Sequence, residues 1–149
     1  MNPDKIMLEG FAATAQLEPL AVTSNPFSIA LGMILLEARP LPGKVVLQFN
    51  PEPLFVQGAG VLQGGALSAM VDFAMAFATL VALPAGSTAT TTTLDVAYLR
   101  AAKPGRYQAI GEVEQLGRRI AFARARLVAL DGDMVVVTAS SSLLILPER

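Results

Sequence analysis

The chain has 149 residues, 53% apolar and only 15% charged, with a formal net charge of −1. This length predicts one domain covering residues 1–149, and the charge excludes the overall positive field that binding to nucleic acid requires. Neither cysteine nor histidine occurs, which excludes disulfides, thiolate nucleophiles, imidazole bases and metal sites built from these residues. Acid–base chemistry therefore has to use Asp, Glu, Lys or Tyr, and the absence of cysteine is compatible with a cytoplasmic location.

The apolar composition predicts either extensive burial in an oligomer or insertion into a membrane. The longest apolar stretch, Ala66–Leu83, carries Asp72 near its centre, where a charge inside a bilayer is costly. Met1–Lys5 has no basic segment followed by a long apolar one, so no signal peptide is expected. We therefore expect a protein without a membrane span that self-associates.

The first part of the chain predicts one helix and two strands. Pro3–Leu17 has the apolar spacing of an amphipathic helix, and the polar, proline-containing stretch Leu20–Ser28 is expected to be a connector. Gly32–Arg39 and Lys44–Asn50 are apolar runs separated by Pro40–Gly43, which is the pattern of two strands joined by a turn.

A long buried helix is expected next, over Ala66–Leu83. Its side chains are apolar nearly all round, which predicts burial on every side. Only Ser68, Asp72 and Thr79 interrupt this surface, and their spacing places them on one narrow stripe. Four strands complete the chain, at Ser87–Leu99, Arg106–Leu116, Ile120–Leu130 and Met134–Leu146. This order predicts an α+β fold: a curved antiparallel sheet of about six strands around one long central helix, with a short N-terminal helix.

Asp72 is the first candidate for chemistry. A carboxylate in an apolar helix carries a desolvation cost unless it is paired or used, and no basic residue occurs between Pro53 and Leu99. The structural alternatives are exposure to solvent or an ion pair with an arginine from a distant strand.

The glycine-rich stretch Gln57–Gly65 directly before the helix is the second candidate. Glycines here let backbone N–H groups face a ligand at the positive end of the helix dipole, where they suit a carbonyl oxygen that becomes negative in a transition state. The alternative is a tight turn that only lets the helix approach the sheet.

Basic residues gather in the second half of the chain. Arg100–Arg126 contains seven of them against two acids, Glu112 and Glu114. Such a region could bind phosphates, and the alternative is a solvated face of the sheet.

These features together resemble the PaaI-like branch of the hotdog thioesterases. That family carries Asn-x-x-Gly-x-x-His-Gly-Gly, followed by a helix with a carboxylate seven residues after the second glycine. The positions that match in register are Gly60, Gly64, Gly65 and Asp72. Leu94–Gly105 and Leu116–Arg119 are similar to the family's later turns, whereas Gln57 and Gln63 replace its asparagine and histidine.

The resemblance implies an acyl-CoA thioesterase. In that scheme the Gly64 N–H polarises the thioester carbonyl, and Asp72 of the facing subunit activates water or attacks the carbonyl directly. Gln57 positions water or the leaving thiol, Gln63 has an orienting or structural role, and Thr93 helps to hold the carboxylate. The residues implied to bind the CoA part of the substrate are Gly65, Arg100, Lys103, Arg118 and Arg119.

The resemblance also implies partners and leaves one alternative open. We expect at least a homodimer, and from the apolar composition a homotetramer, with an acyl-CoA substrate and no metal or separate cofactor. A hydratase or dehydratase of this fold depends on a histidine that the chain lacks. A non-catalytic module that binds or senses acyl-CoA remains open, because Gln63 stands in the histidine position.

Overall fold

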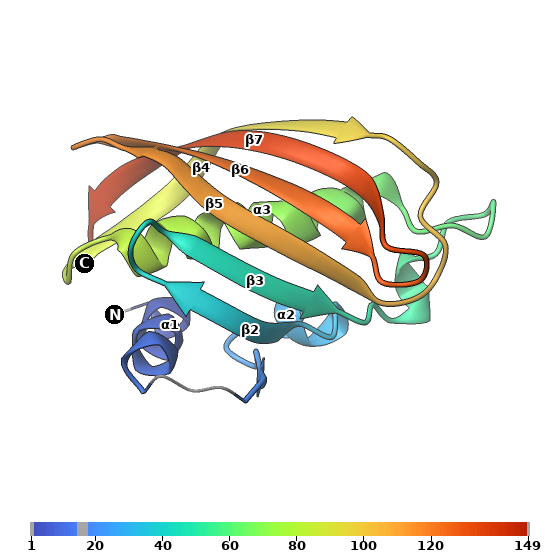
Figure 1. The fold of residues 1–149 in the computed structure, drawn as a ribbon, viewed down its shortest axis with the longest axis horizontal. Coiled ribbons are helices and arrows are strands. Elements are labelled where there is room, and N and C mark those ends of the chain that lie inside the picture. The colour runs from blue at the N-terminus through green and yellow to red at the C-terminus, as the bar shows by residue number, and fades with distance from the viewer. Residues whose placement is uncertain (1, 15–17, 149) are drawn as a thin grey trace.

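In the computed structural model, which describes residues 2–14 and 18–148, an antiparallel sheet curves around one long helix (Figure 1). The helices are α1 (Pro3–Ala13), α2 (Pro26–Ala30) and α3 (Gly64–Ala82), with a 3-10 turn η1 at Pro53–Phe55. The described strands are β1 (Leu20–Ala21), β2 (Ile34–Arg39), β3 (Lys44–Phe49), β4 (Ser87–Tyr98), β5 (Tyr107–Leu116), β6 (Ile120–Ala129) and β7 (Met134–Pro147). Their order across the sheet is β1-β2-β3-β5-β6-β7-β4, so β4 forms one edge.

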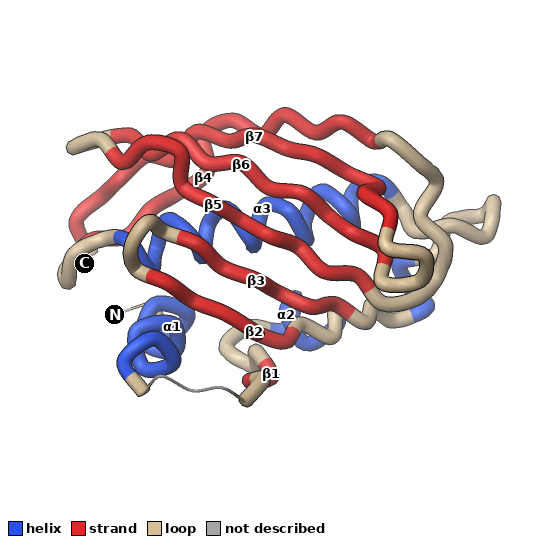
Figure 2. Tube along the Cα trace, viewed as in Figure 1, coloured by secondary structure: helices blue, strands red, loops and turns tan. Residues whose placement is uncertain are grey.

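α3 lies along one face of the sheet, as Figure 2 shows, and supplies the centre of the core. Met70, Val71, Ala74 and Met75 are fully buried there, because the helix is apolar on nearly every side. By length and composition α3 would also pass as a membrane span, but 61% of that stretch is buried inside the domain. The expected α+β architecture of a curved sheet around a central helix is confirmed.

Small residues on the sheet let α3 approach closely. Ala121, Ala123 and Ala125 of β6 point toward the helix and are buried. Gly111 of β5 is the tightest point, because a Cβ added there would lie 2.1 Å from the backbone oxygen of Ala74. The position of α3, and of every side chain it carries, therefore depends on this glycine.

Gly111→Ala is expected to destabilise the fold by about 1–3 kcal/mol or more, since the added methyl group meets backbone that cannot swing away. Thermal unfolding measures this as a melting temperature several degrees below that of the wild type. Gly10→Ala is the matched control, because a Cβ at Gly10 meets nothing within 4 Å. A Gly111→Ala variant that melts with the wild type would contradict the close approach of α3 to β5.

The segment expected to be a connector has structure of its own. β1 pairs with β2, and α2 begins at Pro26 after Asn25, whose side chain accepts from Ser28 N at 2.8 Å. Proline in the first turn and asparagine at the cap are both favourable, and the buried Ser28 hydroxyl donates to Val22 O. Expecting only a connector was therefore wrong. The first helix ends at Ala13 rather than at the expected Leu17, and residues 15–17 lie outside the described part of the chain.

Candidate active site

The first turn of α3 presents two unpaired backbone donors. Helix geometry leaves the first N–H groups of a helix without intrahelical partners, and the N–H groups of Gly64 and Gly65 donate to no acceptor among the described residues. Gln63 is the N-cap residue, in an extended conformation (φ −63°, ψ 137°), and its side chain does not cap the helix. Both donors therefore stand at the positive end of the dipole of a 19-residue helix.

A cavity opens beside these donors. It has a volume of ≈ 340 Å³ and lies between the start of α3 and the segment after β4. Its walls are mostly apolar, and the residues that line it are Val61, Leu62, Gly64, Leu67, Tyr98, Leu99, Arg100, Ala101 and Ala102. The cavity is open to solvent on one side, and a mostly apolar hollow with a few polar groups is the usual form of a small-molecule site.

Asp72 lies further along α3 and is half-buried. One carboxylate oxygen accepts a hydrogen bond from Thr91 Oγ1 at 2.9 Å. Within residues 2–14 and 18–148, no lysine or arginine forms an ion pair with it. The alternative of an ion pair with a distant arginine is not what the structure shows, and one hydrogen bond leaves most of the carboxylate's acceptor capacity unused.

The hydroxyl beside the carboxylate comes from Thr91 rather than from Thr93. The β4–β7 register shifts between these two threonines, where a bulge interrupts the ladder. Successive residues of a strand face opposite sides, so Thr91 and Thr93 would share a face without the bulge and lie on opposite faces with it. Thr91 pairs with the buried Leu143, and Thr93 pairs with Ser142, whose hydroxyl is 2.5 Å from Thr93 Oγ1. The sequence carried no signal for this bulge.

The two glutamines lie at the entrance to α3 rather than beside Asp72. Gln57 is exposed, and its side-chain oxygen accepts from Ala59 N at 2.6 Å within its own turn. That turn projects from the domain before α3 (Figure 1). Gln63 is also exposed, and its backbone N–H donates to Phe55 O at 2.8 Å. Within one chain, neither amide side chain forms a hydrogen bond to the carboxylate.

Gly64 and Asp72 cannot act on one carbonyl group within a single chain. They stand eight residues apart on the same helix, which corresponds to roughly 12 Å along its axis. Within one chain, the donors at the start of α3 and the Asp72 carboxylate therefore lie too far apart to contact the same small group.

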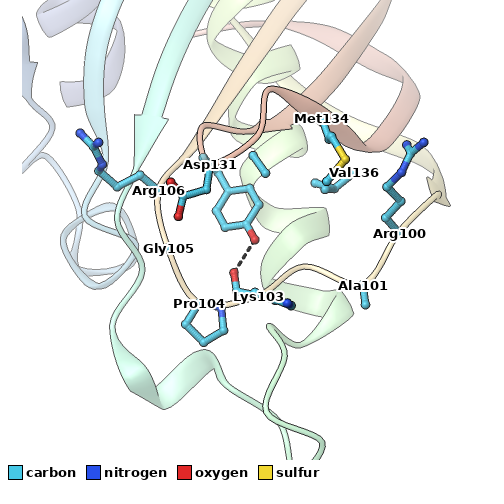
Figure 3. A pocket seen from close by; sticks show the side chains of 11 residues that line it. Arg100, Ala101, Lys103, Pro104, Gly105, Arg106, Asp131, Met134 and Val136 are labelled. Carbon is cyan, nitrogen blue, oxygen red and sulfur yellow. Dashed lines mark hydrogen bonds between the residues drawn. The ribbon is translucent and has the colours of Figure 1, made fainter.

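The loop after β4 carries a second pocket, of ≈ 380 Å³ (Figure 3). Arg100 and Arg106 lie on opposite sides of it, and Lys103 lies between them in the loop. Arg100 is exposed, and its Nη1 donates to Val135 O at 2.9 Å. Arg100 also lines the cavity beside Gly64, so the two hollows are neighbours. The sequence does not single out Arg106, because a basic residue beside a turn is ordinary.

Tyr107 forms part of the wall of this second pocket. Its hydroxyl donates to Lys103 O, which ties the loop to the start of β5 (Figure 3). Burial of the ring, and then the negative charge of Asp131, raise the pKa of Tyr107 above its usual value. A tyrosine phenol is protonated at neutral pH in any case, so the raised pKa only extends its role as a donor to more alkaline solution.

Arg118 and Arg119 lie elsewhere. They form the turn between β5 and β6, at the opposite end of β5 from Arg100 and Lys103. Ten strand residues span about 33 Å, so one chain does not bring the two basic pairs together. The remaining strand arginines are exposed, and Arg124 pairs with Glu112 at 3.0 Å and with Glu114 at 3.4 Å.

A family model described as the thioesterase superfamily matches residues 59–136, which include Gly60, Gly64, Gly65, the whole of α3, Thr91 and the loop after β4. The chain belongs to the thioesterase superfamily. No curated protein sequence matches this thioesterase at a significant level. In residues 2–14 and 18–148, no group of three His, Cys, Asp or Glu side chains could hold a metal ion.

Solved structures place the chain in the hotdog fold. A thioesterase family protein from Silicibacter pomeroyi has 21% identity and a TM-score of 0.79, covering 96% of this chain and 98% of that one. A variant of the phenylacetic acid degradation protein PaaI from Thermus thermophilus has 26% identity and a TM-score of 0.71, covering 80% and 98%. A thioesterase from Haemophilus influenzae has 19% identity and a TM-score of 0.75, covering 83% and 85%. The family and these neighbours support a thioester hydrolase, and the expected hotdog fold is confirmed.

Proposed function

We propose that this thioesterase hydrolyses acyl-CoA to a free acid and CoA in a site shared by two copies of the chain. The observation that carries the proposal is the separation of Gly64 from Asp72 on one helix, which a second copy overcomes by supplying its own Asp72. In this arrangement the Gly64 N–H polarises the thioester carbonyl, and Asp72 of the other copy activates water or attacks the carbonyl carbon.

The open edge of the sheet supports pairing of two copies. β4 has a hydrogen-bonded neighbour on one side only, β7. An unpaired edge strand is a ready template for another chain, and Thr92–Asp95 on this edge are exposed. Pairing along β4 would bury Thr91 and Asp72 together in the interface. The apolar composition favours a further association of such dimers into a tetramer.

The basic pocket supports CoA as the leaving group. The pantetheine arm of an acyl-CoA whose carbonyl lies at Gly64 would run along the apolar cavity to Arg100, which lines both pockets. Lys103 and Arg106 then follow in the second pocket. Guanidinium and ammonium groups suit the phosphates of CoA. Arg118 and Arg119 would take part only from the other copy, since within one chain they lie at the far end of β5. The proposed reaction uses no metal and no separate cofactor. We also propose a cytoplasmic location for the enzyme, where acyl-CoA would be its substrate.

Thiol release from a panel of purified acyl-CoAs tests the proposal, with short, medium and phenylacetyl acyl groups compared. The same acyl groups on pantetheine form the control, since they lack the nucleotide. We expect turnover of at least one acyl-CoA, with a KM below that of the matching acyl-pantetheine. Binding of acyl-CoA without turnover of any member would instead favour a binding or sensing module.

A further inference from the structure

Tyr98 joins the end of β4 to the first turn of α3. Its ring lies 3.4 Å from the place that a Cβ on Gly64 would take, and about half of the side chain, 51%, is exposed. Both residues line the cavity beside the helix. Tyr98 is therefore a wall of that cavity and a support for the glycine turn.

The hydroxyl of Tyr98 has a defined hydrogen-bond direction. It donates to the carbonyl oxygen of Gly64 at 3.0 Å, and Ser68 Oγ lies within hydrogen-bond distance of the same hydroxyl. A phenol has one proton to donate, so the Ser68 hydroxyl is the donor to Tyr98. The three groups form a chain from Ser68 through Tyr98 to Gly64.

The hydrogen bonds from Ser68 through Tyr98 to the Gly64 carbonyl also act on the Gly65 N–H. The carbonyl of Gly64 and the N–H of Gly65 belong to one planar peptide group, so a bond that fixes the oxygen also fixes the direction of the N–H. A donor on the oxygen also polarises the peptide and makes its N–H a stronger donor. The Gly64 carbonyl also serves as a hydrogen-bond acceptor within α3, which begins at Gly64. The Tyr98 hydroxyl is therefore a second donor to the same oxygen.

We propose that Tyr98 is a positioning residue that orients and polarises the Gly64–Gly65 peptide, so that Gly65 N–H acts as a second donor to the thioester oxygen. The inference rests on the proposed function and extends it from one backbone donor to two. Two converging donors stabilise a developing oxyanion better than one, and loss of a full donor typically lowers kcat by about 10²–10³-fold.

Tyr98→Phe tests the inference, because it keeps the ring beside Gly64 and removes only the hydroxyl. We expect a kcat about tenfold lower, a smaller loss than removal of a whole donor, with an unchanged KM. Ser68→Ala removes only the hydroxyl that donates to Tyr98, so it should lower kcat less than Tyr98→Phe does. An unchanged kcat in Tyr98→Phe, or a change confined to KM, would overturn the inference.

A second measurement does not depend on turnover. In Tyr98→Phe, the amide proton signal of Gly65 in ¹H–¹⁵N NMR spectra should move upfield, because its peptide loses polarisation, while that of Gly58 stays in place. An unmoved Gly65 signal would also overturn the inference. A wild type that hydrolyses no thioester would overturn the proposed function, and the Gly65 signal would still decide whether Tyr98 controls this peptide.

Discussion

Asp72→Asn should lower kcat for acyl-CoA hydrolysis by about 10²–10⁴-fold, the usual contribution of a positioned acid–base group. The amide keeps the volume of the side chain and an oxygen that can accept from Thr91 Oγ1, as the carboxylate does now. It can neither take a proton from water nor attack a carbonyl carbon. Thiol release measures kcat, and Asp72→Ala should show the same loss with the cavity enlarged.

Glu18→Gln is the matched control for this experiment. Glu18 is exposed and lies just before β1, at the edge of the sheet opposite β4. Neutralising it changes the net charge as Asp72→Asn does, at a position away from α3 and from the proposed pairing edge. We expect wild-type activity from Glu18→Gln, and full activity in both Asp72 variants would remove Asp72 from the mechanism.

Gly64→Pro should abolish most activity while leaving the fold intact, a loss of about 10²–10³-fold for removal of an oxyanion donor. Proline has no N–H, and the first helical position is the one that it favours. Gln63, with ψ 137°, already has the extended conformation that a residue before proline needs. Gly64→Ala is the control, since it keeps the N–H and places its Cβ at ordinary contact distance from the Tyr98 ring.

The two inactive variants should complement each other when they are mixed. In a heterodimer of Asp72→Asn and Gly64→Pro chains, one of the two sites combines the intact Gly64 of the first with the intact Asp72 of the second. A symmetric dimer has two equivalent sites. When the two variants are refolded together, each heterodimer should therefore have about half of the activity of a wild-type dimer. If mixed variants stay inactive although they form heterodimers, the two groups do not act across the interface.

Features of the site that depend on neighbouring residues in the sequence could be predicted, whereas features that depend on contacts between distant residues could not. Asp72 and Gly64 are candidates from the sequence alone, because a lone charge in an apolar helix and glycines before a helix are local signals. α2 was missed because its five residues depend on the cap at Asn25 and on the contact of Ser28 with Val22, a contact that the periodicity of the chain does not reveal.

Long-range register accounts for the remaining differences. Thr91 replaces Thr93 beside the carboxylate because a bulge against β7 reverses the facing of the strand, and four consecutive threonines give no hint of its place. The basic residues looked like one group along the chain, but an intervening strand carries Arg118 and Arg119 away from Arg100.

The composition of the edge strand β4 affects how an unpaired copy of the chain would behave in solution. It has twelve residues, rich in threonine, with Asp95 as its one charge and with neither proline nor lysine. Natural proteins commonly protect exposed edge strands with charged residues, especially lysine, and with proline, because an unprotected edge can nucleate aggregation. An isolated copy of this chain would thus be prone to form irregular aggregates. Selection against aggregation alone would then favour a β4 edge that is paired, which is the arrangement that the proposed shared site requires.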